Sequence, residues 1–211
     1  MAEKKLIGEG AEARVFRSAE RPNIVEKVFK YPDSPERIKG QFYLTKILHL
    51  LFPKNIPDVH RATSQPRTIH TEFVDLDDSH KKLSEYLIQR RQKGSPDPVM
   101  ETRDVARSRE MHRDQRYISL VKSLEELNPS VDTSTLNYGY DPDGNIIFVD
   151  TFAVWHNRDG GIKRAYDPKK LRRKIIKLKD TDKQRRALWY LEQLERLRDE
   201  AEKKLREKIK K

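Results

Sequence analysis

Residues 131–150, with the sequence VDTSTLNYGYDPDGNIIFVD, contain the pattern that decides the fold prediction. Two short apolar segments, residues 138–140 and 146–149, lie on either side of the turn sequence Asp-Pro-Asp-Gly. In this turn Pro142 fixes one φ angle and Gly144 permits a positive φ, which favours a tight reversal of the chain. The two segments are therefore predicted to pair as a β-hairpin.

Three polar residues flank the predicted hairpin. Asp132 and Asn137 precede its first strand and Asp150 follows its second, so strand pairing is expected to bring Asn137 and Asp150 together. An amide oxygen beside a carboxylate suits a hard cation such as Mg²⁺, which takes few of its ligands from the protein. Asp132 is expected to face the same cleft as a proton acceptor or an orienting group. The alternative is a surface hairpin whose Asp and Asn residues serve only the turn.

The length and composition limit the class of protein. A chain of 211 residues can form one compact domain or two small lobes that share a cleft. The sequence has no cysteine, which excludes disulfides and thiolate metal ligands. It has no apolar run of about eighteen residues, and MAEKKLIGEG lacks the apolar segment of a secretion signal. We therefore expect a soluble, cytoplasmic protein without a membrane partner.

The net charge of +11 is concentrated near the C-terminus. Residues 163–211 hold 20 Lys and Arg against 9 Asp and Glu, whereas positive and negative charges balance over residues 1–162. A localised basic segment of this kind is either a solvated surface or a binding site for an acidic protein or a nucleic acid.

The N-terminal part of the sequence, residues 1–75, predicts a small sheet with one helix. Ser34-Pro35-Glu36 supplies the N-cap, the first-turn proline and the early acid typical of a helix start, and Pro53 is expected to end that helix. Segments rich in β-branched and aromatic residues favour strands. The predicted strands are two within residues 5–17, one at 23–30, and two near 58–62 and 68–74.

Beyond residue 75 the sequence predicts mainly helices, which makes the fold class α+β. Residues 93–99 and 156–161 are predicted to be loops. The pairs Trp155-His156 and Trp189-Tyr190 are interpreted as packing residues, with platforms for base stacking as the alternative. The predicted helices are residues 82–92, one long helix at 101–127, one that begins at Asp167-Pro168, and one that begins at a capping box from Thr181 to Gln184.

The N-terminal sequence GEGAEARV contains two glycines at a spacing found in loops that approach phosphates. The small residues at Gly8 and Gly10, followed by Val15, leave room for the backbone to come close to a phosphate. The alternative is a simple hairpin turn. Twelve residues after Val15, Lys27 lies in the predicted third strand, with Lys30 as the rival position. A solvated strand lysine is the alternative interpretation there.

These segments together resemble the protein-kinase-like superfamily, in particular its small atypical branch of aminoglycoside phosphotransferases and RIO-type kinases. The glycine-rich loop, strand lysine, helix, hinge-like strand IHTEFVD, D-x-x-x-x-N sequence and strand-final Asp follow the family's order across residues 5–150. The resemblance implies a two-lobed fold with a five-stranded N-terminal lobe, one helix in that lobe, and a mostly helical C-terminal lobe. The implied divisions are residues 1–75, residues 76–166, and the basic C-terminal helices of residues 167–211.

The resemblance also implies ATP and Mg²⁺ as cofactors. In this scheme Thr71 would be the gatekeeper beside the adenine. The residues implied in nucleotide binding are Gly8, Gly10 and Val15 in the loop over the phosphates, Lys27 at the α- and β-phosphates, and Glu72 and Val74, whose backbones would hydrogen-bond adenine.

The implied catalytic residues are Asp132 and Lys27. Asp132 would accept the proton of a hydroxyl acceptor or orient that hydroxyl, and Asn137 and Asp150 would bind Mg²⁺. The acceptor itself, a protein Ser/Thr or a small molecule, is not identified by the sequence.

Several positions depart from the family pattern. Ser130-Val131 stand where His-Arg is usual, Asp150 is followed by Thr151-Phe152 instead of Phe-Gly, and no Ala-Pro-Glu segment follows. An activation loop controlled by phosphorylation is therefore not expected.

The helix acid that pairs with the strand lysine in this family has no obvious counterpart. Glu36 lies early in the predicted helix, and the better-placed position is Gln41, which cannot form an ion pair with Lys27. Three hypotheses follow: an ATP-dependent phosphotransferase, a catalytically weak pseudokinase that works as a nucleotide-binding or interaction module, and a nucleic-acid-binding protein that uses its basic tail.

Overall fold

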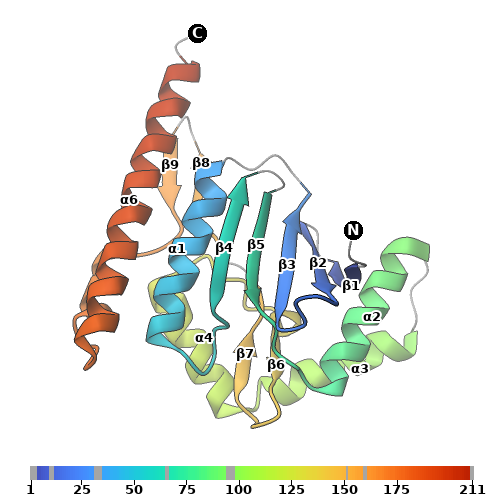
Figure 1. The fold of residues 1–211 in the computed structure, drawn as a ribbon. Helices are drawn as coiled ribbons and strands as arrows, with labels where there is room; N and C mark the ends of the chain where they lie inside the picture. Colours follow the sequence, from blue (N-terminus) through green and yellow to red (C-terminus); the bar gives the residue numbers. More distant parts are fainter. Residues whose placement is uncertain are drawn as a thin grey trace.

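The computed structural model describes residues 4–9, 12–30, 35–64, 67–93, 98–150, 152–158 and 161–209. These residues form an α+β fold that contains a five-stranded antiparallel sheet (Figure 1). The strand order is β1-β2-β3-β5-β4, and the five strands expected in the N-terminal part of the sequence are confirmed. The strands are β1 (Lys4–Glu9), β2 (Ala13–Ser18), β3 (Ile24–Phe29), β4 (Val59–Ser64) and β5 (Arg67–Glu72).

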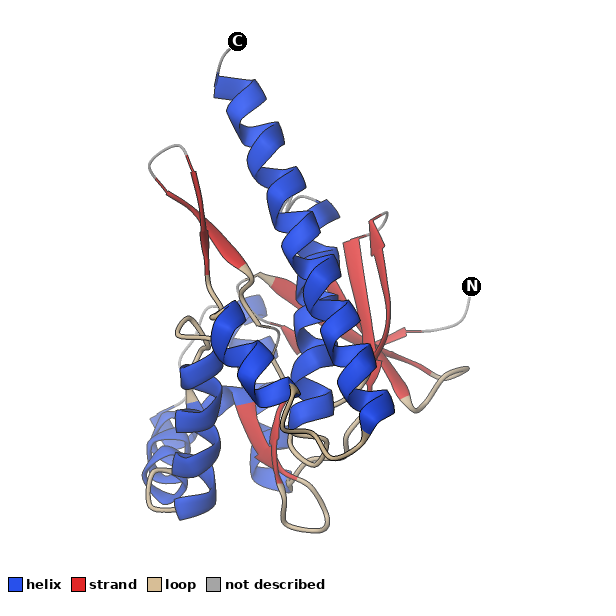
Figure 2. Cartoon of the chain, turned by 90° about the vertical axis from the view of Figure 1, so that its left-hand side faces the viewer, coloured by secondary structure: helices blue, strands red, loops and turns tan. Residues whose placement is uncertain are grey.

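One helix, α1 (Pro35–Leu51), is inserted between β3 and β4, as predicted. It ends two residues before Pro53, because proline cannot continue the helical hydrogen bonds. In Figure 1, α1 lies between strand β4 and the long C-terminal helix α6 (Thr181–Ile209). The C-terminal helix is therefore packed against the body of the protein along α1. Figure 2 shows its C-terminal end rising beyond the rest of the molecule.

The remaining elements are short helices and two small hairpins. The helices are α2 (Asp78–Lys93), α3 (Pro98–Met111), α4 (Gln115–Leu127), the 3-10 turn η1 (Thr135–Asn137) and α5 (Pro168–Ile175). The hairpins pair β6 (Tyr138–Tyr140) with β7 (Ile146–Phe148), and β8 (Trp155–Arg158) with β9 (Gly161–Arg164). The first hairpin is the one predicted from its turn, where Gly144 has a φ of 76°.

The prediction of a single long helix at residues 101–127 is wrong. The chain breaks at Asp114, whose extended backbone separates α3 from α4 and whose carboxylate accepts a 2.8 Å hydrogen bond from the backbone N–H of Arg116. A carboxylate in this position is an N-cap, which starts a new helix instead of continuing the old one. The start of α6 also differs from the prediction, since Asp180, and not Thr181, accepts hydrogen bonds from the backbones of Asp182 and Lys183, both at 3.0 Å.

The prediction of a loop at residues 156–161 is wrong at residues 156–158 and 161, which pair in β8 and β9, whereas residues 159 and 160 lie outside the described residues. The segment is polar in sequence, but it is flanked by two apolar side chains that pack in the interior. Trp155 is 3% exposed, and Ile162 packs against the main core. Burial of these two side chains anchors β8 and β9 to the main core.

The interior has two apolar clusters. The smaller one lies beside the sheet and contains Ala13, Phe29 and Ile69. The larger one joins α1, α4, the β6–β7 hairpin and α6, and its fully buried members include Leu48, Leu124, Phe148 and Leu194.

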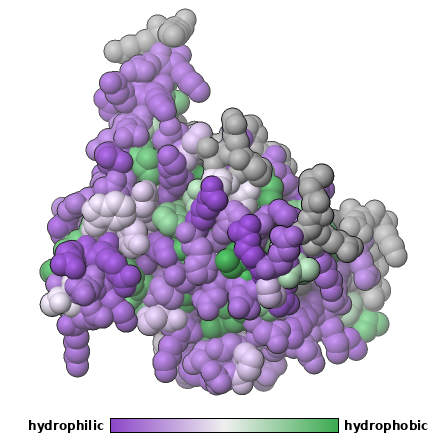
Figure 3. Space-filling model, in the orientation of Figure 1, coloured by the Kyte–Doolittle hydropathy of each residue, from purple (hydrophilic) through white to green (hydrophobic). Residues whose placement is uncertain are grey.

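The face shown in Figure 3 is mostly hydrophilic, with small scattered apolar areas. Among the helices that the structure describes, none combines the length and the apolarity that crossing a membrane requires.

Candidate functional site

Lys27 and Asp150 form an ion pair between Nζ and Oδ1. Lys27 lies in the centre of the sheet, because its strand pairs with Val15 of β2 on one side and Ile69 of β5 on the other. Asp150 follows β7, so the contact joins the sheet to the β6–β7 hairpin. The two side chains are 14% and 31% exposed, which leaves the pair partly shielded from water and open on one side.

The rival lysine has another partner. Lys30 Nζ lies 2.6 Å from Glu9 Oε1, and Arg14 Nε lies 3.2 Å from the same oxygen. These cations hold the pKa of Glu9 below its usual value, against the opposing effect of burial. The structure thus brings Lys27 to Asp150 and Lys30 to Glu9.

Asn137 is joined by a backbone hydrogen bond to Val149, the residue before Asp150. The N–H of Val149 donates to the Asn137 carbonyl at 2.8 Å. The Asn137 side-chain amide nitrogen donates to the Asp132 carbonyl at 3.5 Å, which turns the amide oxygen the other way.

This donor set fits Mg²⁺. In the described residues no three His, Asp or Glu side chains gather as a metal cluster, and Mg²⁺ needs only one or two protein oxygens when water and phosphate supply the rest. Asn137 and Asp150, the residues predicted to bind Mg²⁺, would offer one amide oxygen and one carboxylate at the two ends of the β6–β7 hairpin.

Asp132 lies on the loop before η1 and is exposed. Its Oδ1 accepts a 2.9 Å hydrogen bond from the Ser134 N–H, which is the local turn bond that the alternative interpretation proposed. Tyr117 of α4 fixes the loop, because its hydroxyl donates to the Thr133 carbonyl at 2.7 Å.

The glycine-rich segment is only partly described. Gly8 pairs with Val15 across β1 and β2, and a register shift between Leu6 and Gly8 marks a bulge there. A Cβ on Gly8 would come no closer to Val15 than 3.5 Å, so space alone does not require glycine at this position. Gly10 lies outside the described residues.

The hinge-like strand leaves one backbone donor available. The Glu72 N–H and the Thr71 hydroxyl both donate to the Asp58 carbonyl, at 2.8 and 2.9 Å. The Phe73 N–H donates to the Asn23 carbonyl at 2.9 Å. Within the described chain the Val74 N–H has no hydrogen-bond acceptor. The backbone N–H of Val74 is thus available and that of Glu72 donates to Asp58, and the contacts of both backbones with adenine stay a prediction.

The sequence interpretation missed the residues that connect the hinge-like strand to the hairpin. Asp77 exchanges two hydrogen bonds with Tyr140, one from its backbone N–H at 2.8 Å and one to its carboxylate at 2.9 Å. Burial by itself raises the pKa of Asp77, but the donors at Tyr140, His80 and Arg107 outweigh it and lower the pKa. Asp77 also caps α2, because its carboxylate accepts a hydrogen bond from the His80 N–H. The helix cap is the one role of Asp77 that could be inferred from the neighbouring sequence.

Arg107 of α3 completes this connection. Its guanidinium is 6% exposed, donates to the Tyr138 carbonyl at 2.7 Å and lies 3.5 Å from Asp77. His80 contributes a ring nitrogen 3.2 Å from the Leu136 carbonyl, where it donates. Together these three side chains hold the backbone on both sides of Asn137. Because Arg107 lies in a polar helix, its burial could not be predicted from the sequence.

The two helix positions considered as partners of Lys27 lie elsewhere. Glu36 pairs with Lys204 of α6. Gln41 is 2% exposed, and its side-chain oxygen has no hydrogen-bond partner among the described residues.

The comparisons with known proteins give a weak likeness. No protein-family model and no curated protein matches the chain. Among solved structures, the GDP complex of wild-type aminoglycoside 2'-phosphotransferase-IIIa is 10% identical, with a TM-score of 0.31 over 92% of this chain and 83% of that one. The GDP complex of a mutant of the same enzyme is 12% identical, with a TM-score of 0.30 over 98% and 88%. Both neighbours are phosphotransferases of the protein-kinase-like fold, but TM-scores this low carry no argument about the present chain.

Proposed function

We propose that this protein is a small atypical kinase, which transfers the γ-phosphate of ATP to the hydroxyl of an acceptor with the help of Mg²⁺. The observation that carries the proposal is the pairing of Lys27 with Asp150. A strand lysine meets an aspartate 123 positions later, and the Asn137 backbone is hydrogen-bonded to Val149, the residue before that aspartate. A turn-forming surface hairpin has no need of either contact.

In this proposal the chain has the two-lobed arrangement of protein kinases. Residues 1–75 form the N-terminal lobe, residues 76–166 form the C-terminal lobe, and residues 167–211 add the basic helices. The nucleotide lies between the lobes, with adenine near Glu72 and Val74 and the phosphates beneath the segment of Gly8, Gly10 and Val15.

Phosphoryl transfer depends mainly on positioning and on charge stabilisation. Mg²⁺ would supply neutralisation of the phosphate charge, held by Asn137 and Asp150. Lys27 binds the α- and β-phosphates through its ammonium group. The Asp132 carboxylate accepts the proton of the acceptor hydroxyl, whose oxygen forms the new bond to phosphorus as the bond to ADP breaks.

The test is the melting temperature with and without Mg-ATP, in the parent, in Asp150→Ala and in Asp143→Ala. Asp143 is an exposed aspartate in the turn of the same hairpin, so its substitution is the matched control. At about 100 times the dissociation constant, ligand binding adds about 2.7 kcal/mol, which raises Tm by about 5–10 °C in a chain of this size. GTP is measured in parallel.

We expect the rise in the parent and in Asp143→Ala, and its loss in Asp150→Ala. A parent that shows no rise at millimolar Mg-ATP or Mg-GTP would contradict the proposal. So would an Asp150→Ala protein that responds like the parent.

A pseudokinase is the second candidate, and the pairing of Glu36 with Lys204 favours it. In this arrangement the first-turn acid of α1 is held by the C-terminal helix. ADP release in the presence of protein, aminoglycoside and water acceptors separates the two candidates. Nucleotide-dependent stabilisation without turnover on any of them supports the pseudokinase, and turnover that Asp132→Ala abolishes supports the kinase.

A further inference from the structure

The basic excess of this protein is located at one corner of the fold. Residues 169–186 contain ten Lys and Arg against two Asp, whereas residues 187–209 contain six basic and six acidic residues. We call residues 169–186, which comprise most of α5, the following turn and the start of α6, the α5–α6 corner. The rest of the C-terminal helix is therefore neutral, and the charge belongs to the corner.

Most of the corner's cations form no ion pair with a described residue, although Asp180 lowers the positive potential around Lys183 and Arg186. In the described part of the chain, Lys174 lies 3.7 Å from Glu126 and Arg185 lies 2.9 Å from Asp182. The cations without an ion pair among the described residues are Lys169, Lys170, Arg172, Arg173, Lys177, Lys179, Lys183 and Arg186. By contrast, the neutral part of α6 pairs its charges internally, as at Arg196–Glu200 and Arg206–Glu202.

The corner is a helical hairpin whose apolar residues face inward. Leu171 and Ile175 of α5 are fully buried, so Arg172, Arg173 and Lys177 are left on the exposed side. The side chain of Gln184 donates to the Ile176 carbonyl at 2.9 Å and joins the start of α6 to the end of α5.

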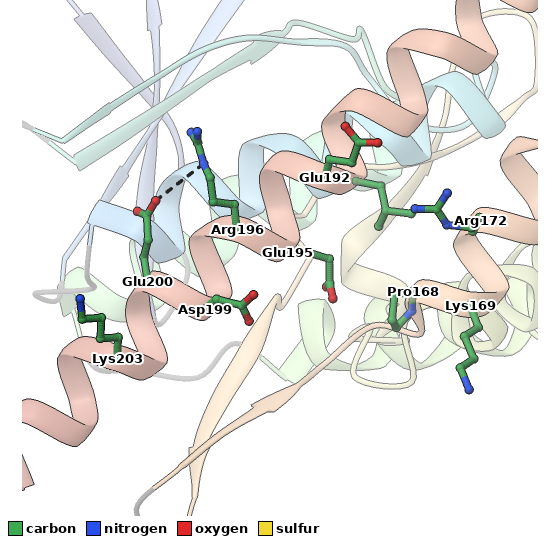
Figure 4. Close-up of a pocket in the computed structure, with 10 residues that line it drawn as sticks. Pro168, Lys169, Arg172, Glu192, Glu195, Arg196, Asp199, Glu200 and Lys203 are labelled. Atoms are coloured by element: carbon green, nitrogen blue, oxygen red, sulfur yellow. Dashed lines mark ion pairs between the residues drawn. The ribbon is translucent and has the colours of Figure 1, made fainter.

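An open groove of about 680 Å³ runs between the two helices from this corner (Figure 4). Lys169 and Arg172 contribute to it from α5, and Glu192 and Arg196 from α6. Away from the corner, both acidic and basic side chains line the groove. A polyanion is therefore expected to bind only at the corner itself.

An exposed aromatic ring lies within one turn of the corner. Trp189 follows Arg185 and Arg186 by four and three residues, which places it on the same side of α6. Its ring meets Tyr43 edge-on, with centroids 5.8 Å apart, yet Trp189 is 49% exposed. The sequence predicts that Trp189 and Tyr190 are packing residues. The Trp189 ring does pack against Tyr43, but about half of the side chain stays exposed.

From these features we infer that the α5–α6 corner binds single-stranded nucleic acid. The unpaired lysines and arginines contact the phosphates, and Trp189 stacks on a base. Cationic surfaces with an accessible aromatic side chain bind single strands in this way, without sequence preference. An acidic peptide would match the charge but has no base for Trp189. This inference goes beyond the proposed kinase activity and does not depend on it.

The test uses the full chain and labelled single strands of about 12 nucleotides, as RNA and as DNA. Fluorescence anisotropy gives Kd between about 50 and 200 mM salt. The corner variant carries Arg172→Glu, Arg173→Glu and Lys177→Glu. The control variant carries the same charge change at exposed residues elsewhere, Lys122→Glu, Lys163→Glu and Lys208→Glu. Melting temperatures of both variants verify folding.

We expect the corner variant to weaken binding at least tenfold and the control variant to stay within twofold of the parent. Loss of three phosphate contacts should reduce the slope of log K against log salt by about 2. Trp189→Ala should weaken the binding of the single strand more than the binding of a duplex of the same length.

Three results would overturn the inference. One is the absence of binding at the lowest salt, and another is equal weakening by the two charge variants. The third is displacement of the nucleic acid by polyglutamate at equal charge concentration together with no effect of Trp189→Ala, which would indicate an acidic protein partner.

Discussion

Gly139 of β6 lies directly against Leu76 of the segment that follows β5. A Cβ on Gly139 would come within 2.9 Å of Leu76 Cδ1 and within 3.1 Å of its Cγ. Leu76 is 8% exposed, so its side chain has little room to move aside. The absence of a side chain at Gly139 thus allows the hinge-like segment and the hairpin that carries Asn137 and Asp150 to touch.

Gly139→Ala should therefore destabilise the protein by about 1–3 kcal/mol, the usual cost of overpacking. It should also reduce the Mg-ATP stabilisation, because β6 must shift away from Leu76. Urea denaturation with and without nucleotide measures both effects. The control is Gly144→Ala, where a φ of 76° is strained for alanine but no atom lies within 4 Å. It should cost about 1 kcal/mol and leave nucleotide stabilisation intact. Equal nucleotide responses in the two variants would contradict this account.

Removal of either partner of the Lys27–Asp150 pair should destabilise the protein by about 1–2 kcal/mol. The pair is partly exposed, so the cost lies between those of surface and buried ion pairs. The double-mutant cycle of Lys27→Met and Asp150→Asn should give a coupling energy of about 1 kcal/mol. In the proposed reaction each single variant loses about 100-fold in activity or more, and the double variant loses little beyond that. A coupling energy of zero would mean that the two side chains are independent.

Protein stability should fall as the pH drops below about 6.5, in part because of His80. Burial lowers the pKa of His80, and the nearby Arg107 lowers it further. Unfolded histidine keeps its ordinary pKa of about 6.5, so below that pH the unfolded state binds more protons than the folded state. Burial also lowers the pKa of His70, which acts in the same direction.

His80→Gln should therefore reduce the slope of unfolding free energy against pH between pH 7.5 and 5.5. Part of the slope should remain, because His70 also contributes to it. His112→Gln, at an exposed histidine, is the control and should keep the slope of the parent. Chemical denaturation at several pH values measures both. An unchanged slope in His80→Gln would contradict the prediction.

Leu194→Ala should destabilise the protein by about 2–5 kcal/mol. Leu194 of α6 is 0% exposed, and its Cδ1 would lie 3.4 Å from a Cβ on Gly40 of α1. Leu205→Ala on the same helix is the matched control. Leu205 is only half-buried and lies outside the main core, so its loss should cost about 1 kcal/mol or less. Similar losses at both positions would mean that packing on α1 does not anchor α6.

The sequence predicted the elements that carry their own local signals. The turn before Gly144, the proline that ends α1 and the β-branched strands each act within a few residues, and all were placed correctly. The break at Asp114 was missed because no proline or glycine lies between residues 99 and 128, and only the cap geometry reveals a new helix.

Contacts between distant segments were not predictable from periodicity. Arg107 looks like a solvated residue of a polar helix, yet it is buried against the Tyr138 carbonyl. The charge count assigned the basic excess to the whole tail, whereas the structure separates the α5–α6 corner from a neutral helix. The backbone contact between Asn137 and Val149 was accessible, because pairing of the predicted hairpin strands brings the two ends of the hairpin together.

The packing of α6 along α1 has a consequence for biosynthesis. Helix α1 leaves the ribosome early, but the helix that covers it is made only after α2, α3, α4 and α5. Until then the buried side chains of α1, such as Leu44 and Leu48, lack the covering that α6 provides. We therefore expect the main core to close only after α6 has been synthesised. Nascent chains that stop before α6 should be the forms that aggregate or recruit chaperones.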